Sequence, residues 1–498
     1  MLMILVQNFP FISIILSMVT GVLCAVLKPK AARNLCLGTI TAIGVMSAAV
    51  LQFTLRTGEY YVYWMGHFPA PFGNEIRIGV FEALMALMFS LVMMLSLFGG
   101  MKHIFHDVEE TKINSYFLMI NLLFSSMLAL IYTNDLFTAY VFVEINTIAS
   151  CAIVMLRRAK ETLVATTRYL IMSLLGSGLF LIGICILYDI TGHLLMSNIK
   201  ESIAVLAATG EYRLPLEMIV CLFAIGMAIK SALYPFHSWL PDAHGSSTSS
   251  SSAILSGLVL KAYIILLIKI FYRVIGLDVL YGTKAVNVLF VMGLIAMVMG
   301  SFNSLKENDL KRMIAYSSVA QIGYIYMGIG LGSVFGMVAA CFHILAHAVT
   351  KPMLFCAAGG FMEVSGGSKK FTDIRGAGWR NMLAGIAFVV GSLSMIGIPF
   401  TAGFVSKMNL AAAALEMPGK MIPALIVLSI STVLNALYYI PAIMVLFSRS
   451  GDKCKFVPDR KDLPFIISMV VFIALNFVLG IGSRPFIQMI TDGLGMLG

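Results

Sequence analysis

Two lysines lie inside apolar runs of the segment MAIKSALYPFHSWLPDAHGSSTSSSSAILSGLVLKAY, which covers residues 227–263. They are Lys230 and Lys261, and two prolines, two histidines and a serine tract separate them. A lysine in the middle of a membrane costs several kcal/mol or more, so it indicates function unless its amine extends to the headgroups. Burial favours the neutral amine and a nearby carboxylate favours the charged one. A lysine held between these influences suits a proton relay.

Three further ionisable residues lie deep in apolar runs: Lys351, Lys407 and Glu144. Lys407 follows a predicted helix break, whereas the helix of Lys351 could itself break near Pro352, which would let that lysine reach the headgroups. Glu144 is the natural partner of Lys230, because an ion pair that forms and breaks would set the proton affinity of the lysine. We therefore predict that Glu144 and Lys230 approach each other, directly or through water.

The segment CFHILAHAVTKPM places His343, His347 and Lys351 four residues apart, so they share one stripe of a helix. Two histidines at this spacing could hold zinc, but no glutamate follows the first and no third ligand is evident. A buried structural pair is a second alternative. We favour a water-linked proton path along the stripe, because histidine titrates nearest neutrality.

His237 and His244 follow the predicted break in the first lysine helix, and they suit a relay or a structural cap equally well. The tract from Ser246 to Ser252, which includes Thr248, is either a low-complexity loop or a set of hydroxyls lining a wetted helix start. The sequence does not decide between the two alternatives for the histidines or for the serine tract.

The composition indicates the elements that must position these residues. Hydrophobic residues make up 59% of the 498, charged residues 12%, and the mean hydropathy is +0.94. Soluble domains are nearer ~25% charged. The apolar runs recur at about 20 residues, enough for a helix to cross a hydrocarbon core of ~30 Å. We predict an all-α membrane protein.

The net charge of +10 reflects an excess of lysine and arginine in the loops on one side of the membrane rather than nucleic-acid binding. The eight single cysteines suggest no metal, and no cofactor motif is present.

We predict fourteen transmembrane helices with short connections. They cover residues 3–27, 33–56, 77–100, 113–132, 135–156, 164–189, 215–236, 250–272, 284–303, 310–331, 334–361, 381–415, 421–448 and 463–490. Connections after odd-numbered helices hold 21 lysines and arginines, whereas those after even-numbered helices, Arg273 among them, hold seven. The rich side should be cytoplasmic. Both termini would then face outward from the cytoplasmic membrane. Glu82, Asp189 and Lys269 fall near helix ends.

Helices 7 and 12 are predicted to be broken. LYPFHSWLP carries Pro235 and Pro241, and SMIGIPFTAGFVSKMNL carries Gly397, Pro399 and Gly403. Paired broken helices indicate an inverted repeat around a central ion path. We predict that helices 4–8 repeat as helices 9–13. The resulting units are residues 1–112, 113–273, 274–448 and 449–498.

Four segments together resemble the antiporter-like subunits shared by Mrp-type cation/proton antiporters, respiratory complex I and membrane-bound hydrogenases. They are KSALYPFHSWLPDAH…SAILSGLVLK, LKRMIAYSSVAQIGY, HILAHAVTK and IGIPFTAGFVSK. HFPAPFGNEIRIGVFEALMALM is similar to the Mrp D-type subunit and its hydrogenase relatives. The chain departs from the family in GSSTSSSS, where an Ala-Pro and a Val-Ser pair are usual.

The resemblance implies roles for matched positions. It assigns relay positions on helices 5, 7, 8, 11 and 12 to Glu144, Lys230, Lys261, His343, His347, Lys351 and Lys407. The expected function is proton translocation within a complex of membrane subunits, with a sodium path here or in a partner. The first alternative is the membrane arm of a redox-driven complex, such as a [NiFe] hydrogenase or a complex I-like oxidoreductase. A stand-alone solute transporter and an inert scaffold explain the motifs less well.

Overall fold

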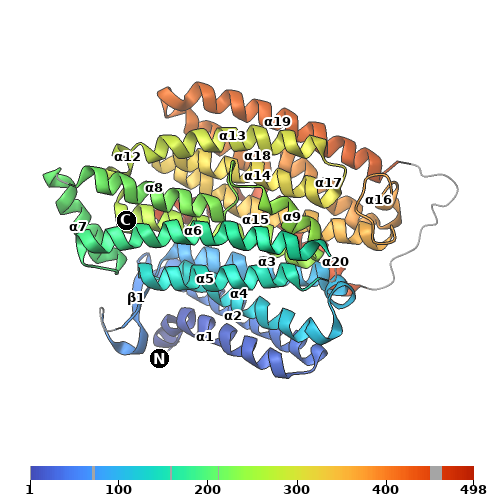
Figure 1. The fold of residues 1–498 in the computed structure, drawn as a ribbon, viewed down its shortest axis with the longest axis horizontal. Helices are drawn as coiled ribbons and strands as arrows, with labels where there is room; N and C mark the ends of the chain where they lie inside the picture. Colours follow the sequence, from blue (N-terminus) through green and yellow to red (C-terminus); the bar gives the residue numbers. More distant parts are fainter. Residues whose placement is uncertain (1, 70–72, 158–159, 211, 449–461) are drawn as a thin grey trace.

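The computed structural model describes residues 2–69, 73–157, 160–210, 212–448 and 462–498. Long helices lie side by side and form most of the molecule (Figure 1). A small antiparallel sheet pairs β1 (Tyr61–Trp64) with β2 (Glu75–Ile78), with Tyr61 opposite Ile78. The predicted all-α membrane fold is confirmed.

Eleven helical spans in the described ranges are long and apolar enough to cross a membrane. Those in the first half are α1 (Leu2–Val26), α2 (Pro29–Thr57), α3 (Val80–Asp107), α4 (Ile113–Tyr132), α5 (Leu136–Met155), α6 (Glu161–Thr191) and the eighth predicted span, Ser249–Ile275. Those in the second half are α13 (Ala285–Lys306), α15 (Val334–Glu363), α19 (Pro418–Leu446) and α20 (Leu463–Ile481). The three remaining predicted spans are α14 (Leu310–Gly330) and two broken helices.

The predicted breaks in helices 7 and 12 are confirmed. Helix 7 consists of α8 (Arg213–Lys230) and α9 (Trp239–Ser246), and Pro235 lies in the non-helical segment between them. Helix 12 consists of α17 (Met382–Ile396) and α18 (Ala402–Leu415). Gly397 begins the second break at φ +96°, a conformation that glycine adopts without a steric penalty. The breaks thus place helix ends beside Lys230 and Lys407.

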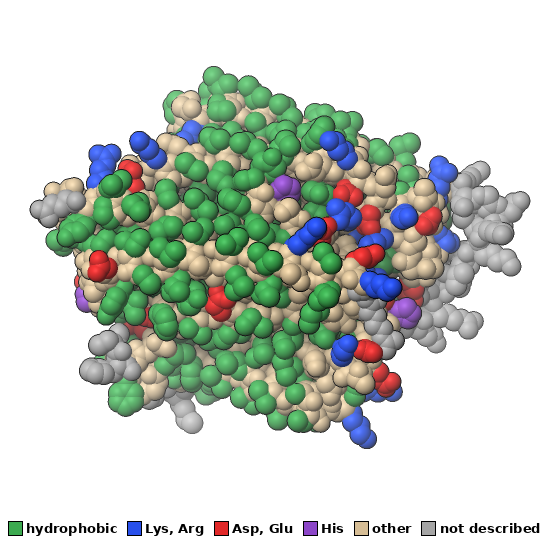
Figure 2. Space-filling view, in the orientation of Figure 1, with side chains coloured by type: hydrophobic (Ala, Val, Ile, Leu, Met, Phe, Trp, Pro, Cys, Tyr) green, Lys and Arg blue, Asp and Glu red, His purple; other side chains and the backbone are tan. Residues whose placement is uncertain are grey.

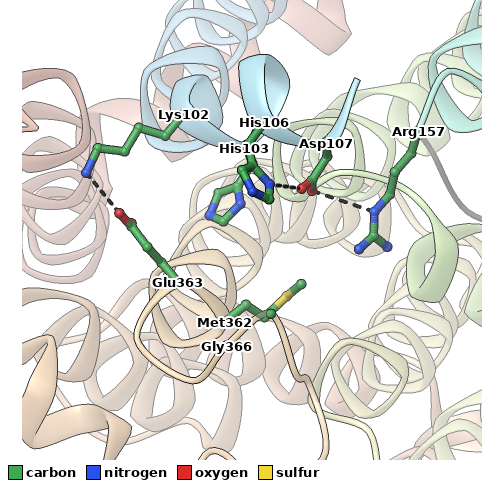
Figure 3. A pocket seen from close by; sticks show the side chains of 9 residues that line it. Lys102, His103, His106, Asp107, Arg157, Met362, Glu363 and Gly366 are labelled. Atoms are coloured by element: carbon green, nitrogen blue, oxygen red, sulfur yellow. Dashed lines mark hydrogen bonds and ion pairs between the residues drawn. The ribbon is translucent and has the colours of Figure 1, made fainter. Parts of the chain in front are cut away.

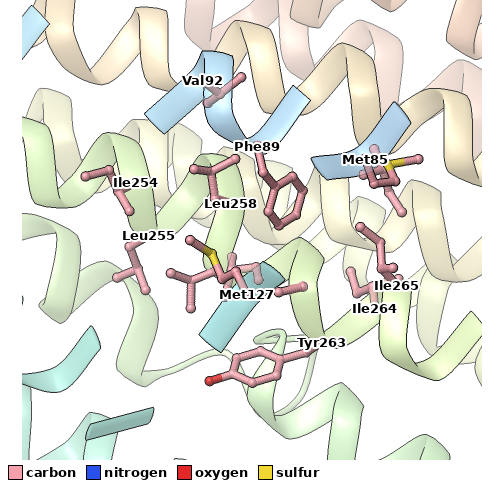
Figure 4. Packing of buried hydrophobic residues seen from close by; sticks show 14 of the residues in the cluster. Met85, Phe89, Val92, Met127, Ile254, Leu255, Leu258, Tyr263, Ile264 and Ile265 are labelled. Carbon is pink, nitrogen blue, oxygen red and sulfur yellow. The ribbon is translucent and has the colours of Figure 1, made fainter. Parts of the chain in front are cut away.

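The eighth span runs through the centre of the bundle and is buried along its whole length. It consists of α10 (Ser249–Ile254), a π-helical turn η3 (Leu255–Val259), α11 (Leu260–Ile270) and a second π-helical turn η4 (Phe271–Ile275). Apolar side chains of α3 and α4 surround it. Figure 4 shows Phe89, Met127 and Leu258 in this packing. The sequence did not predict the π-helical turns, which are rare and often mark functional positions.

Several elements differ from the sequence prediction. The connection after helix 6, predicted as a loop, holds α7 (Met196–Thr209). The last predicted helix, 463–490, is two helices: α20 ends at Ile481, and α21 (Ser483–Gly495) follows Gly482. Pro485 cannot donate a backbone hydrogen bond to α20, so it favours a new helix start. The remaining short helices are η1 (Met65–His67), η2 (Glu110–Lys112), α12 (Leu277–Gly282) and α16 (Ala377–Arg380).

Both termini lie at one end of the bundle, with α7 and α12, and α16 lies at the other end (Figure 1). We call the α16 end the basic end, because the connections rich in lysine and arginine meet there. Hydrophobic side chains cover much of the middle of the face in Figure 2, and charged side chains gather mainly toward the basic end. Six of the basic loop residues lie outside the described residues: Arg158, Arg449, Lys453, Lys455, Arg460 and Lys461.

Candidate functional site

Lys230 is the last residue of α8, so the helix break places its amine beside α5. It is fully buried, and its Nζ donates to Thr147 Oγ1 at 2.7 Å. Its Nζ also lies 5.2 Å from the ring centre of Tyr263. Thr147 is three residues after Glu144 on α5, so both side chains share one face of that helix. A hydroxyl therefore stands next to the predicted lysine–glutamate pair.

Glu144 makes no ion pair within 4 Å with Lys230 in the described residues. Its Oε1 is buried and has no hydrogen-bond partner there. The predicted approach of the two groups thus takes no direct form here, and the water-mediated form stays a prediction. Sequence spacing could not reveal the intervening hydroxyl, because it depends on how α5 and α8 pack.

Lys261 directly follows the first residue of α11, after the π-helical turn η3. It is fully buried and donates to the backbone carbonyl of Ser256, inside that turn. The hydroxyls of Ser256 and Ser318 are 3.0 Å apart, which connects this position to α14. The π-helical geometry thus presents a carbonyl oxygen to a lysine in the middle of a continuous span.

The predicted stripe of His343, His347 and Lys351 lies on one continuous helix, α15, which passes through Pro352 without a break. The alternative in which Lys351 escapes at a break is therefore wrong. Lys351 is fully buried and donates to the carbonyl of Ile314 at 3.0 Å, to Ser317 Oγ, and to Tyr439 OH at 3.3 Å. Every one of these acceptors is neutral.

His343 connects the stripe to the second broken helix. Its Nδ1 is 2.7 Å from Ser406 Oγ on α18, and its ring stacks on Tyr324 at 5.4 Å. Lys407 follows Ser406, and its Nζ lies 5.3 Å from the centre of the Tyr324 ring. Lys407 donates to the carbonyl of Ile396 at 2.7 Å and to Thr432 Oγ1 at 3.1 Å. The break in helix 12 thus supplies the free carbonyl that holds this lysine.

His347 lies between these groups and has no hydrogen-bond partner on either ring nitrogen in the described chain. Its ring stacks on His343 at a centroid distance of 6.0 Å, and it interacts electrostatically with Lys261 and Lys351. His347 is therefore the stripe residue on which the charges of Lys261, from the eighth span, and of Lys351 both act. Over the described ranges, histidine, cysteine, aspartate and glutamate form no group of three that could hold a metal ion.

The two secondary histidines lie in different surroundings. His237 is half-buried in the helix 7 break, where it stacks on Tyr234 at 4.9 Å. His244 is fully buried on α9 and stacks on Phe355 of α15 at 4.6 Å. Only His244 therefore reaches the helix that carries the stripe.

Ser249 to Ser252 form a buried helix start, so the low-complexity loop alternative is wrong for them, whereas a wetted lining stays a prediction. Thr248 caps α10 by accepting from the backbone amide of Ser251 at 3.1 Å. Ser250 donates to the carbonyl of Ser96 at 3.0 Å, and Ser251 to that of Ile153 at 3.1 Å. These hydroxyls attach α10 to α3 and α5.

The sequence analysis missed several buried charges in the described chain: Glu75, Arg77, Glu82, Lys269, Arg273 and Lys311. Arg273 NH2 and Glu82 Oε1 form an ion pair at 2.5 Å, and each side chain is 1% exposed. Lys269 donates to the carbonyls of Ile131 and Thr133 at 2.6 and 2.7 Å, at the end of α4. The pattern of apolar runs predicted that these residues lie near helix ends or in loops, where charges are usually exposed. The one signal in the sequence was that Glu82 and Arg273 are opposite charges at the same predicted end of helices 3 and 8.

Residues 133–435, more than half the chain, match the family described as "NADH:quinone oxidoreductase/Mrp antiporter, TM". The NADH-quinone oxidoreductase subunit N of Desulforudis audaxviator is 31% identical over 82% of this chain and 79% of that protein. The D-type subunit of the Na(+)/H(+) antiporter of Alkalihalophilus pseudofirmus is 26% identical over 90% of this chain and 89% of that protein.

A chain of an archaeal respiratory complex, the membrane-bound sulfane sulfur reductase, has a similar fold. The TM-score is 0.86 at 25% identity, and the match covers 100% of this chain and 97% of that chain. The likeness therefore extends over the whole bundle, including the helices outside the family match.

Proposed function

The chain belongs to the NADH:quinone oxidoreductase/Mrp antiporter transmembrane family, and on this premise we propose that it translocates protons across a membrane. It acts as an antiporter-like subunit of a multisubunit cation/proton antiporter. The relative from the Na(+)/H(+) antiporter of Alkalihalophilus pseudofirmus supports this assignment. A coupled sodium path lies in this chain or in a partner subunit.

One observation carries the proposal: ionisable groups lie within both broken helices and within the eighth span and α15, and Lys230, Lys261, His347 and Lys351 among them are fully buried. We order them as a line that begins at Lys230, passes Lys261 and His347, and ends at the half-buried Lys407. Neutral hydroxyl and carbonyl oxygens accept hydrogen bonds from the lysines along it. Such acceptors bind an amine without fixing it in the charged form as a buried carboxylate would.

Each part of this line has a role in the proposal. Glu144 sets the protonation of Lys230 through Thr147, and Lys261 passes the proton to His347. Lys351 and His343 extend the relay along α15, and Lys407 releases the proton beside the helix 12 break. The first and second halves, residues 113–273 and 274–448, provide one half-channel each as inverted repeats.

The chain works with other membrane subunits in the cytoplasmic membrane. Both termini face outward, because the basic end should face the cytoplasm. Relatives named as subunits of larger assemblies support such partners.

A second candidate follows from the fold match to a respiratory complex. In that case redox chemistry in other subunits drives the same proton path. Purification under mild detergent and identification of the co-purifying chains decides between the two. Antiporter subunits alone support the first, and iron–sulfur or [NiFe] subunits support the second.

Transport itself is tested with the purified complex in liposomes that contain a pH-sensitive dye. A sodium gradient should drive proton movement if the antiporter assignment is correct. A complex that moves no protons under a sodium gradient or under redox turnover would contradict both candidates.

A further inference from the structure

A pocket of about 600 Å³ opens at the basic end of the bundle (Figure 3). Its lining includes His103 and Asp107 from the end of α3, Arg157, and Glu363 from the end of α15. Asp107 is 3.6 Å from Arg157. The pocket thus places two imidazoles, those of His103 and His106, and two carboxylates where water can exchange protons with them. None of these residues belongs to the lysine line described above.

Beside the pocket, α15 carries a glycine against which Ser249 and His103 pack closely. A Cβ on Gly359 would lie 2.6 Å from Ser249 Oγ and 3.0 Å from His103 Nε2. Any larger residue would therefore fill the space that the imidazole and the hydroxyl share. Ser249 is 1% exposed, and its hydroxyl has no hydrogen-bond partner among the described residues. A buried hydroxyl without a partner is uncommon and indicates a site for water.

Gly359 lies about two turns beyond Lys351 on α15. Positions 351, 355 and 359 follow one another at intervals of four, and each step turns the position by about 40° around the helix. At the rise of an α-helix, Gly359 is about 12 Å along the axis from Lys351. This part of α15 therefore joins the region of the pocket to the buried Lys351.

His244 occupies the middle of this interval. Its ring stacks on Phe355 at 4.6 Å and 20°, and both ring nitrogens are buried without a partner in the described chain. It interacts electrostatically with the buried Lys311 first, and then with Lys351 and Lys261. An imidazole with two free nitrogens can accept a proton on one side and release it on the other.

We propose that His103, Ser249 and His244 form a proton access path from the basic-end pocket to Lys351 and Lys261. It deepens the proposed function by giving the relay a connection to water on that side. His103 takes a proton from pocket water, the Ser249 hydroxyl gives up one proton as it gains another, and His244 transfers one to the lysines. In this path buried water bridges the gaps; His103, Ser249 and His244 each return to their starting charge, and the lysine that receives the proton becomes an ammonium.

Contacts to the backbone between α9 and α10 should keep this segment in place when a single serine hydroxyl is removed. Three basic side chains donate to backbone carbonyls here: Lys369 to Gly245 at 2.6 Å, Arg157 to Ser246 at 3.1 Å, and Lys311 to Ser247 at 2.6 Å. These contacts hold the junction of α9 and α10 independently of the serine side chains. Ser250 is a matched control, because its hydroxyl is already committed to the carbonyl of Ser96.

The first test is His103→Ala in the complete complex, in membrane vesicles of known orientation. We expect proton flux to fall roughly 100-fold or more, the scale of a lost proton-transfer group. Imidazole added on the basic side should restore flux, because it fits the enlarged pocket, whereas imidazole on the other side should not. His193→Ala, at an exposed histidine on the opposite end, should leave flux unchanged.

The second test compares Ser249→Ala with Ser250→Ala, with subunit levels checked by blotting. Ser249→Ala should slow flux by a similar factor, and Ser250→Ala should not. Wild-type flux in Ser249→Ala or His103→Ala would overturn the path. So would a His103→Ala defect that imidazole does not restore, or an equal defect in both serine variants. If the wild-type complex moves no protons, the proposed function fails instead.

Discussion

At the residue scale, the buried lysines differ from ordinary buried ions in their partners. Lys230 and Lys407 donate to hydroxyl and carbonyl oxygens, and neither makes an ion pair within 4 Å in the described ranges. Arg273, in contrast, is paired with Glu82 at 2.5 Å. A buried ion pair fixes its charges, whereas a lysine on neutral oxygens can lose its proton at lower cost. The kind of partner, a neutral oxygen or a carboxylate, therefore distinguishes the proposed relay lysines from the structural Arg273.

Glu144→Ala should abolish transport and leave assembly intact. The Oε1 atom of Glu144 has no partner in the described structure, so truncation removes little native contact energy. Asp189→Ala is the matched control, since it removes an exposed carboxylate from the end of α6. Proton exchange in vesicles is the measurement. Wild-type exchange in Glu144→Ala would show that the carboxylate does not control Lys230.

The Glu82–Arg273 pair should behave as a structural element. Arg273→Met leaves a buried carboxylate unpaired, and we expect it to lower the free energy of unfolding by roughly 3–5 kcal/mol. Glu82→Leu combined with Arg273→Met should recover part of this loss. The recovery is incomplete because Glu82 also accepts from the amide of Gly79 at 2.9 Å. Thermal stability in detergent measures both, and equal stability of the single variant and wild type would count against a structural role.

At the element scale, helix interruptions position the reactive groups. The end of α8 places Lys230, the π-helical turn η3 presents a carbonyl to Lys261, and the helix 12 break presents one to Lys407. Proline and glycine made both breaks predictable. The π-helical turns were not, because FYRVI contains no proline or glycine, and a single glycine such as Gly257 in LSGLV also occurs inside regular α-helices. The burial of Lys269 also escaped prediction, since it depends on the end of α4.

The close packing of the two halves of helix 12 can be tested at Gly403. A Cβ there would lie 1.8 Å from the carbonyl oxygen of Ser394, so α18 must move away from α17. Gly403→Ala should cost about 1–3 kcal/mol of stability and displace Lys407. Gly178→Ala is the control, because nothing lies within 4 Å of that position on α6. Equal melting temperatures for the two variants would contradict this packing.

At the scale of the whole molecule, the charge pattern and the hydrophobic faces describe a protein that crosses a membrane with its termini on one side. Hydropathy and loop charge predicted this arrangement, because both follow directly from the bilayer as solvent. The line of buried groups could be predicted only in part. His244 and the stripe on α15 meet through tertiary packing, and the sequence left His244 open between a relay and a cap.

The dependence on partners is a further whole-molecule prediction. A proton path that depends on coupling to partner subunits should not transport protons without them. Proteoliposomes that contain only this purified chain should therefore show no coupled proton exchange. The intact complex, reconstituted at the same protein density, is the control. Coupled exchange by the isolated chain would favour a self-contained antiporter.

The relay itself is tested most directly by proton flux in vesicles that carry Lys407→Arg, with subunit levels checked by blotting. Arginine can keep the hydrogen bonds to Ile396 and Thr432, but it stays protonated because its pKa is above ~12. We expect a complex that folds, assembles and no longer passes protons. Near wild-type flux in Lys407→Arg would contradict a relay through this lysine and leave it a structural charge.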